Sequence, residues 1–252
     1  MILLTNDDGI FSDGIRALRE AIVAKEEAIV VAPDSEQSAV GHAITISNPL
    51  RVKETHFNGE FWGYAVSGTP ADCVKIAVGS ILEEPPKIVI SGINHGGNLG
   101  TCVIYSGTVS AATEAAILGI PSIAVSLNDF ENLDFSFAAS FIAKLYPQVL
   151  AMNLPKGIVL NVNVPAVPGS EIKGVVFAKQ GGLKVVDQFE KRKDPRNSTY
   201  YWMSGDVVLD PNEKNTDGDY VSQNYVTITP VHYDLTHYET LEKLKDLKID
   251  WE

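Results

Sequence analysis

Apolar and polar residues alternate along the first part of the chain in blocks that predict strands and helices in turn. Residues 28–32 (AIVVA) form a continuous β-branched run, which is typical of a strand buried on both faces. Residues 14–24 (GIRALREAIVA) instead place their aliphatic side chains at helical spacing. Further strands are expected at residues 1–5, 87–91, 121–126, 157–164 and 226–229, and further helices at 110–118, 135–150 and 241–247. This rhythm predicts an α/β fold with a three-layer α/β/α, Rossmann-like, mostly parallel sheet.

Three of the predicted strands end in polar loops. The sequences TNDDG (residues 5–9), APDSEQS (32–38) and SGINHGGN (91–98) each complete or follow such a strand. Parallel strands end at the same edge of a sheet, and open α/β sheets bind their ligands at that edge. We therefore expect these three loops to converge on one site.

Beyond residue 183 the pattern changes. Residues 184–224 are polar, contain the charged run EKRKD (190–194) and show no helical period, so we expect extended hairpins that form an arm. The arm holds the aromatic residues Phe189, Tyr200, Tyr201 and Trp202. Exposed aromatic side chains on an arm usually need a partner surface, while an arm folded back on its own domain is the alternative. We thus divide the chain into a Rossmann-like core (1–183) and a segment (184–252) of hairpin arm, late strand and terminal helix that serves oligomerisation.

Composition and charge restrict the classes of partner. The chain has 252 residues, of which 45% are hydrophobic and 21% charged, and this is ordinary for a globular protein. Its formal net charge of −12 argues against binding to nucleic acid polymers or to anionic membranes. A local anion site for a small phosphate compound remains compatible with that charge. No apolar run is long enough to span a membrane.

The cysteines and the N-terminus indicate the compartment. Cys73 and Cys102 form no Cys-x-x-Cys pair, so we expect no disulfide framework. The first apolar stretch has no basic residue before it and stops at Asn6, unlike a signal peptide. These features favour a cytoplasmic protein.

The adjacent carboxylates Asp7 and Asp8 are the first candidates for chemistry. Two carboxylates in one turn repel each other, and a divalent cation would relieve that repulsion. Oxygen ligands of this kind suit hard ions such as Mg²⁺. The alternative is that one of the two caps a helix or closes an Asx-turn. Asn6 could cap or orient the same turn.

Neutral oxygen donors follow on the two neighbouring loops. Ser38 is by itself a routine loop serine without a Gly-x-Ser-x-Gly motif, but its hydroxyl could ligate a metal. Asn94 and Asn98 lie among four glycines, in a pattern that is neither Gly-x-Gly-x-x-Gly nor a P-loop. Their amides offer a carbonyl ligand and an N–H donor. His95 is a candidate acid or phosphate-binding residue.

Small hydroxyl residues open the helix that comes next. Ser106, Gly107 and Thr108 stand at its predicted start, in the sequence YSGTVSAA. Such residues at a helix N-terminus can bind an anion through backbone N–H groups, hydroxyls and the helix dipole. Plain N-capping by one hydroxyl is equally compatible. A hard cation beside an anion site suits hydrolysis of a phosphate ester through attack of a metal-activated water.

Six segments, in one order over nearly the whole chain, resemble the SurE family (survival protein E), the 5′/3′-nucleotidases. They are ILLTNDDGI (2–10), APDSEQSAVGHAIT (32–45), VSGTPADCV (66–74), ISGINHGGNLGTCVIYSGTVSAATEAA (90–116), DPRNSTYYW (194–202) and YVTITPVHYDLT (225–236). Three positions depart from the family's pattern, because Ala39, Ser110 and Asn197 stand where glycine is common.

The resemblance implies a divalent-metal-dependent phosphomonoesterase that hydrolyses nucleoside 5′/3′-monophosphates. It implies that Asp7 and Asp8 act at the catalytic centre and, together with Ser38 and Asn94, ligate one Mg²⁺ or Mn²⁺ ion per subunit. The arm and C-terminal segment match a part that exchanges between subunits, which implies a homodimer or homotetramer. We predict phosphate or substrate contacts from Asn6, Asn94, His95, Asn98, Ser106, Gly107 and Thr108.

Some alternatives stay open. An aspartyl-phosphate enzyme of the haloacid dehalogenase type needs a second acid two residues after its nucleophile, where Gly9 stands. A receiver-like switch module is shorter, at about half this length. A nucleotide-binding module without turnover would be recognised by the absence of hydrolysis with added Mg²⁺ or Mn²⁺. Proton transfer could fall to Asp7, Asp8 or His95.

Overall fold

A computed structural model describes residues 1–131, 133–182, 184–208 and 213–251. The strands of its main sheet are β1 (Ile2–Thr5), β2 (Ala28–Pro33), β3 (Val52–Phe57), β4 (Glu60–Val66), β5 (Val89–His95), β6 (Ser122–Asn128), β7 (Ile158–Pro165), β8 (Gly174–Phe177) and β11 (Tyr225–His232). Within the described residues these nine strands form one sheet in the order β3-β4-β2-β1-β5-β6-β7-β11-β8.

Most neighbouring strands of this sheet are parallel. The central run β4-β2-β1-β5-β6-β7 is parallel throughout, and β11 is parallel to β8. Within the described part of this nine-stranded sheet, only β3 with β4 and β11 with β7 pair antiparallel. The prediction of an α/β fold around a mostly parallel sheet is therefore confirmed.

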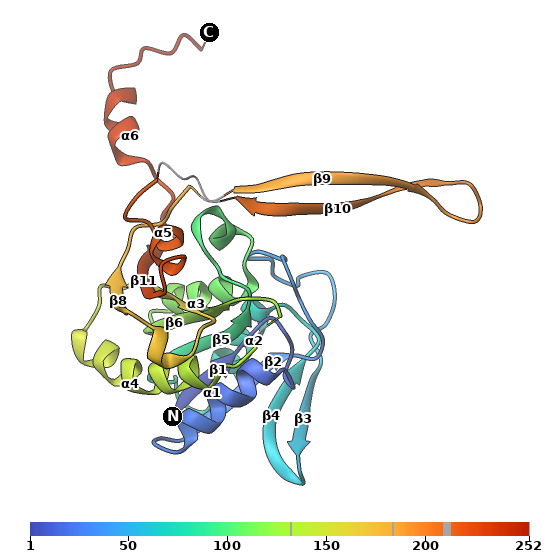
Figure 1. Ribbon diagram of the computed structural model, residues 1–252, viewed down its shortest axis with the longest axis vertical. Coiled ribbons are helices and arrows are strands. Elements are labelled where there is room, and N and C mark those ends of the chain that lie inside the picture. Colours follow the sequence, from blue (N-terminus) through green and yellow to red (C-terminus); the bar gives the residue numbers. More distant parts are fainter. Residues whose placement is uncertain (132, 183, 209–212, 252) are drawn as a thin grey trace.

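Helices cover both faces of the sheet, as Figure 1 shows. The helices that pack on the sheet are α1 (Asp13–Val23), α2 (Pro70–Ile76), α3 (Gly107–Ile117) and α4 (Ser136–Met152). The side chains of α1 and α4 pack into one apolar cluster with the sheet, whereas α2 and α3 pack on the opposite face. Strand β1 is apolar because both of its faces are buried: Leu4 packs in the first cluster and Leu3 in the cluster on the opposite face. No helix of the described chain combines the length and apolarity needed to cross a membrane.

The topology brings the three polar loops to one edge of the sheet. Because β2, β1 and β5 are parallel neighbours, their carboxyl ends lie side by side. The loops after these strands contain the acidic turn, the Ser38 segment and the Gly-rich segment. This convergence, predicted from the strand pattern, is confirmed.

The predicted arm is a long hairpin that projects from the body of the protein (Figure 1). Its strands β9 (Lys184–Lys193) and β10 (Thr199–Val208) pair antiparallel. At the turn between them Asn197 adopts a φ of 67°, a conformation that asparagine tolerates better than most residues. The side chains of Phe189, Tyr201 and Trp202 are more than half exposed, so the folded-back alternative is wrong.

Two predictions about the last third of the chain need correction. Residues 184–224 are not hairpin alone, because α5 (Asp217–Val221) is a short helix that Thr216 caps by accepting a hydrogen bond from the Asp219 N–H. Five residues are too few to show a helical period. The terminal helix α6 (Tyr238–Leu244) begins earlier than predicted, because the His237 side chain caps it by accepting from the Thr240 N–H.

Several elements were not predicted at all. They are the hairpin of β3 and β4, the helix α2, the edge strand β8, and the short helical turns η1 (Ala77–Ile81), η2 (Gly100–Ile104) and η3 (Gly169–Glu171). Asn58-Gly59 between β3 and β4 adopts positive φ at both residues, which is the usual signal of a tight hairpin turn. Thr69 and Asp72 form a capping box at the start of α2, with Pro70 at its first position. Both signals were present in the sequence.

Candidate active site

The turn after β1 is held by Asn6, whose exposed fraction is 0%. Its Nδ2 donates to the Gly9 carbonyl oxygen at 2.9 Å and to the Ser12 hydroxyl at 2.7 Å. Gly9 adopts a φ of 96°, a conformation that favours glycine. The Asn6 side chain therefore shapes the turn that presents Asp7 and Asp8, and it does not itself line the neighbouring cavity.

Asp7 is buried against the N-terminus of α3. The hydroxyl and the backbone N–H of Thr108 both donate to its carboxylate. Gly107 lies so close that a β-carbon there would stand 2.8 Å from Asp7 Cβ. Burial raises the pKa of Asp7 above its ordinary value, although the Thr108 hydrogen bonds oppose this shift. The start of α3 thus holds Asp7 in place and favours its ionised form.

The side chain of Asp8 is only 8% exposed and faces a histidine. His95 Nδ1 lies 2.8 Å from Asp8 Oδ1. Burial, and after it the charge of Asp7, raises the pKa of Asp8 from 3.8 to about 7. Two buried carboxylates on adjacent residues are costly to keep ionised, and a nearby positive charge lowers that cost. The electrostatics of the pair therefore favour a bound cation.

A cavity of about 800 Å³ opens at this edge of the sheet. Six of the residues predicted for the site line it: Asp7, Ser38, Asn94, His95, Asn98 and Ser106. The other four surround it, since Asp8 contacts His95, Thr108 and Gly107 contact Asp7, and Asn6 holds the turn. The structure thus brings the predicted residues together around one cavity.

Two neutral side chains could complete a cation site. Asn94 Nδ2 donates to the Gly96 carbonyl oxygen at 2.6 Å, which leaves Asn94 Oδ1 available as a ligand. The exposed Ser38 hydroxyl lines the cavity and donates its proton to Glu36, which leaves the oxygen lone pairs available to a cation. Within the described ranges, no group of three or more His, Cys, Asp and Glu side chains is placed to hold a metal. The available donors, two carboxylates with neutral oxygens, fit Mg²⁺ or Mn²⁺ with water completing the shell.

The start of α3 has fewer free hydrogen-bond donors for an anion than we predicted, because several are already used within the protein. Ser106 caps the helix by accepting from the Val109 N–H at 3.0 Å. Thr108 is engaged with Asp7 through its hydroxyl and its N–H. Ser106 still lines the cavity, and its hydroxyl proton remains able to donate to a ligand.

The Ser38 segment has no helix or strand between β2 and β3, so side-chain and backbone contacts determine its position. The Gln37 N–H donates to the Asp7 carbonyl oxygen at 2.8 Å, and the Gly41 N–H donates to the Tyr105 carbonyl oxygen at 2.9 Å. Ala39, between these two anchors, adopts a φ of 55°, a left-handed conformation that favours glycine.

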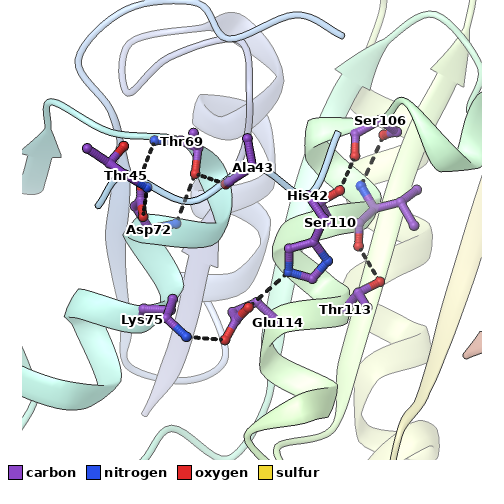
Figure 2. Close-up of polar contacts among 11 residues, drawn as sticks. His42, Ala43, Thr45, Thr69, Asp72, Lys75, Ser106, Ser110, Thr113 and Glu114 are labelled. Carbon is purple, nitrogen blue, oxygen red and sulfur yellow. Dashed lines mark hydrogen bonds and ion pairs between the residues drawn. The ribbon is translucent and has the colours of Figure 1, made fainter. Parts of the chain in front are cut away.

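Two buried carboxylates fix the rest of this segment, as Figure 2 shows. Glu114 on α3 lies 2.9 Å from His42 Nε2 and 2.9 Å from Lys75 Nζ. Asp72 on α2 accepts a hydrogen bond from the Thr45 N–H at 3.0 Å. Neither acid was predicted to serve the site, because Asp72 is 27 residues from Thr45 in sequence and Glu114 is 72 residues from His42.

Sequence reasoning also missed part of the cavity wall. Tyr105, Phe130 and Met203 line the cavity in addition to residues of the Gly-rich segment. Phe130 follows β6, whose carboxyl end lies at the same sheet edge, so the rule that located the other loops could have found it. Met203 belongs to β10, and no sequence signal places that strand beside the cavity.

Fold and site together define a class of protein: an α/β protein with a mostly parallel sheet and an oxygen-rich acidic site at the carboxyl edge of its strands. The family model described as "Survival protein SurE" matches residues 2–187. The chain therefore belongs to the SurE family, and the resemblance seen in the sequence is confirmed.

Relatives cover nearly the whole chain. A "5′-nucleotidase SurE" from Syntrophobacter fumaroxidans is 51% identical over 96% of this chain and 97% of its own length. Another with the same name, from Carboxydothermus hydrogenoformans, is 51% identical over 97% of this chain and 94% of its own length. The crystal structure of a SurE protein from Aquifex aeolicus superimposes with a TM-score of 0.84 at 42% identity, covering 97% of this chain and 98% of that one.

Proposed function

We propose that this chain is a 5′-nucleotidase, an enzyme that hydrolyses nucleoside monophosphates to a nucleoside and phosphate with the help of a divalent metal ion. The names of its relatives support the reaction. The observation on which the metal dependence rests is the buried pair Asp7 and Asp8, where burial and mutual repulsion raise the pKa of Asp8 to about 7 in the absence of a cation.

The residues divide into two groups by chemistry. Asp7, Asp8, Ser38 and Asn94 would hold one Mg²⁺ or Mn²⁺ ion, which would polarise a phosphoryl oxygen and lower the pKa of a water molecule. His95, Asn98 and Ser106, which line the same cavity, would bind and orient the phosphate. Gly107 and Thr108 act through Asp7, and Asn6 acts through the turn.

Proton transfer has a structural candidate in His95. Its Nδ1 is 2.8 Å from Asp8 Oδ1, so its Nε2 is the nitrogen left to face other groups. A carboxylate that holds one ring nitrogen orients the imidazole for proton exchange at the other. We therefore propose that His95 exchanges a proton with the reacting groups, while Asp8 orients its ring.

We also propose that the chain forms an oligomer. The projecting hairpin and the exposed C-terminal segment within 184–252 would pack against a second copy of the chain, giving a homodimer or homotetramer with one ion per subunit. Exposed apolar side chains gathered on one segment usually mark an interaction site.

Substitution of the acidic pair tests the reaction and the metal together. Asp7→Asn and Asp8→Asn should each lower hydrolysis of an aryl phosphate and of nucleoside 5′-monophosphates by about 100-fold or more, because the metal-binding charge is removed. EDTA should abolish wild-type turnover, and Mg²⁺ or Mn²⁺ should restore it. The matched control is Asp13→Asn, because the Asp13 side chain is 66% exposed and pairs with Arg16 outside the site.

Circular dichroism of the purified variants would show that they are folded. A wild-type rate in either the Asp7 or the Asp8 variant would refute the metal site. Binding of nucleotides without any turnover at all, with every metal tried, would instead identify a binding module. A trapped covalent phosphoenzyme would revive the aspartyl-phosphate alternative.

A further inference from the structure

Strand β7 carries two buried asparagines that its position in the sheet does not explain. Asn161 and Asn163 each have an exposed fraction of 0%. They are two residues apart on one strand and therefore point to the same face, the face on which Val159 packs beneath α3. Amide side chains in such a layer are unfavourable unless they are hydrogen-bonded.

Both asparagines bind the backbone of one residue in the Gly-rich segment. Asn163 Oδ1 accepts from the Asn98 N–H at 2.8 Å, and Asn163 Nδ2 donates to the Asn98 carbonyl oxygen at 3.1 Å. Asn161 Nδ2 donates to the same carbonyl oxygen at 2.8 Å. The two amides thus hold the N–H and the C=O of Asn98 at once.

The side chain of Asn98 is held as well. Its Nδ2 donates to the Ser126 hydroxyl on β6 at 2.8 Å. Ser126 is the register partner of Asn163 on one side and of Asn94 on the other. The proposed metal ligand Asn94 and the residue that holds Asn98 therefore belong to one polar row across β5, β6 and β7.

Stability alone does not account for this row. Asn161 Oδ1 is buried and has no hydrogen-bond partner among the described residues. Thr227 on β11, the register partner of Asn163, likewise has a buried hydroxyl without a partner in that part of the chain. A leucine at position 161 would remove the first of these unpaired atoms, while Asn98 would keep both of its bonds to Asn163. What the asparagines provide instead is a fixed place for Asn98.

The anchor at Asn98 affects the position of the Gly-rich segment in the cavity wall. Asn94, His95 and Asn98 all line the cavity, and the chain between the last two contains Gly96 and Gly97, which constrain the backbone little. Without an anchor at Asn98 this segment could shift relative to the acidic turn. We propose that Asn163, supported by Asn161, is a positioning residue for the reaction, which holds the Gly-rich segment so that Asn94 and Asn98 meet the metal and the phosphate. This inference rests on the proposed nucleotidase function.

Asn163→Leu and Asn161→Leu in the full-length protein test the proposal. Leucine is close to asparagine in shape, so the layer stays filled while the hydrogen bonds to Asn98 are lost. We expect kcat for a nucleoside monophosphate to fall about 10- to 100-fold in Asn163→Leu, with a smaller change in KM, since misplaced groups chiefly affect the transition state. Asn161→Leu should have a smaller effect, because Asn98 keeps both bonds to Asn163. Asn163→Asp, which keeps an acceptor for the Asn98 N–H, should recover part of the loss.

Val162→Ala is the matched control. Val162 lies between the two asparagines, and its side chain packs in the cluster on the opposite face of the sheet. Its truncation should lower the melting temperature while leaving kcat within about twofold of wild type. A fall in kcat in the control equal to that in Asn163→Leu would overturn the proposal, because general destabilisation of β7 would then explain both.

Hydrogen exchange separates this inference from the proposed function. Backbone amides of residues 94–100 should exchange faster in Asn163→Leu than in wild type, and not in Val162→Ala, whether or not the protein hydrolyses nucleotides. If the wild type lacks nucleotidase activity, the proposed function fails while the exchange rates still report on the anchor. Unchanged exchange together with wild-type kcat in Asn163→Leu would overturn the positioning role. If Asn163→Leu does not fold, the positioning role is tested with Asn161→Leu and Asn163→Asp instead, by kcat and by hydrogen exchange of residues 94–100.

Discussion

At the scale of single residues, Glu114 shows how a buried charge outside the cavity lining serves the site. Its side chain is 5% exposed and pairs with His42 and Lys75. The hydrogen bond from His42, assisted by Lys75, holds the pKa of Glu114 below its ordinary value of 4.5. His42 belongs to the segment that contains Ser38, so this ion pair network ties that segment to α2 and α3 (Figure 2).

The pH dependence of stability follows from the direction of that shift. A carboxyl whose folded-state pKa is lowered contributes stability above its ordinary pKa and loses it as pH falls through the folded value. Glu114→Gln should therefore lower the free energy of unfolding by about 1–2 kcal/mol at neutral pH, and this difference should shrink as pH falls below 4.5. Urea unfolding of Glu114→Gln and of wild type, at neutral pH and below pH 4.5, measures this difference in free energy. Glu84→Gln is the control, because Glu84 is exposed. A constant difference at all pH values would contradict the ion pair.

At the scale of elements, the contact between α3 and the acidic turn decides the position of Asp7. Gly107 occupies the first turn of α3, where an added β-carbon would meet Asp7 Cβ at 2.8 Å and Asp7 Oδ2 at 2.9 Å. Alanine favours helices, so the helix itself would tolerate the change. What has to move is the carboxylate or the helix, and either movement disturbs the acidic pair.

Gly107→Ala should thus reduce kcat by about 10-fold or more with little change in melting temperature. Gly79→Ala is its control, because a β-carbon at Gly79 would meet no atom within 4 Å. That variant should keep wild-type activity. Steady-state kinetics and thermal unfolding of both proteins are the measurements, and equal activities for the two would argue against a close contact between α3 and Asp7.

The elements also show what the sequence could reveal. The buried strands and the long helices were predictable because their apolar periodicity is strong, and the shared edge of three loops followed from the parallel order. The five-residue helix α5 is too short for a period, and the edge strand β8 is only four residues long. In the site, Asp7 and Asp8 could be recognised from local sequence. The hydrogen bonds between Asn163 and Asn98 could not be predicted, because 65 residues separate the two in sequence. An asparagine within an apolar strand also gives no indication of its partner.

At the scale of the whole molecule, the C-terminal segment is unusual because its apolar side chains face outward. Helix α6 buries none of its residues, and Leu235 and Trp251 are 87% and 84% exposed. Figure 1 shows α6 and the C-terminus extending from the body on one side, apart from the hairpin of β9 and β10. The strand β11, by contrast, belongs to the main sheet. Exposed apolar side chains of the C-terminal segment therefore follow β11 and add to those of the hairpin, and a second copy of the chain is the proposed partner.

A chain ending at Asp234 tests this assembly without removing β11 or the Tyr233 ring, which lies close to Gly157. The full-length protein should have the mass of a dimer or tetramer by light scattering. The shortened chain should assemble into fewer subunits than the full-length protein. Its body should stay folded, because the sheet and its covering helices remain complete. Leu241→Lys is a milder variant that should weaken assembly in the intact chain, since α6 would carry a charge into the interface. A monomeric full-length protein, or an unchanged assembly after truncation, would mean that these apolar side chains serve no contact between subunits.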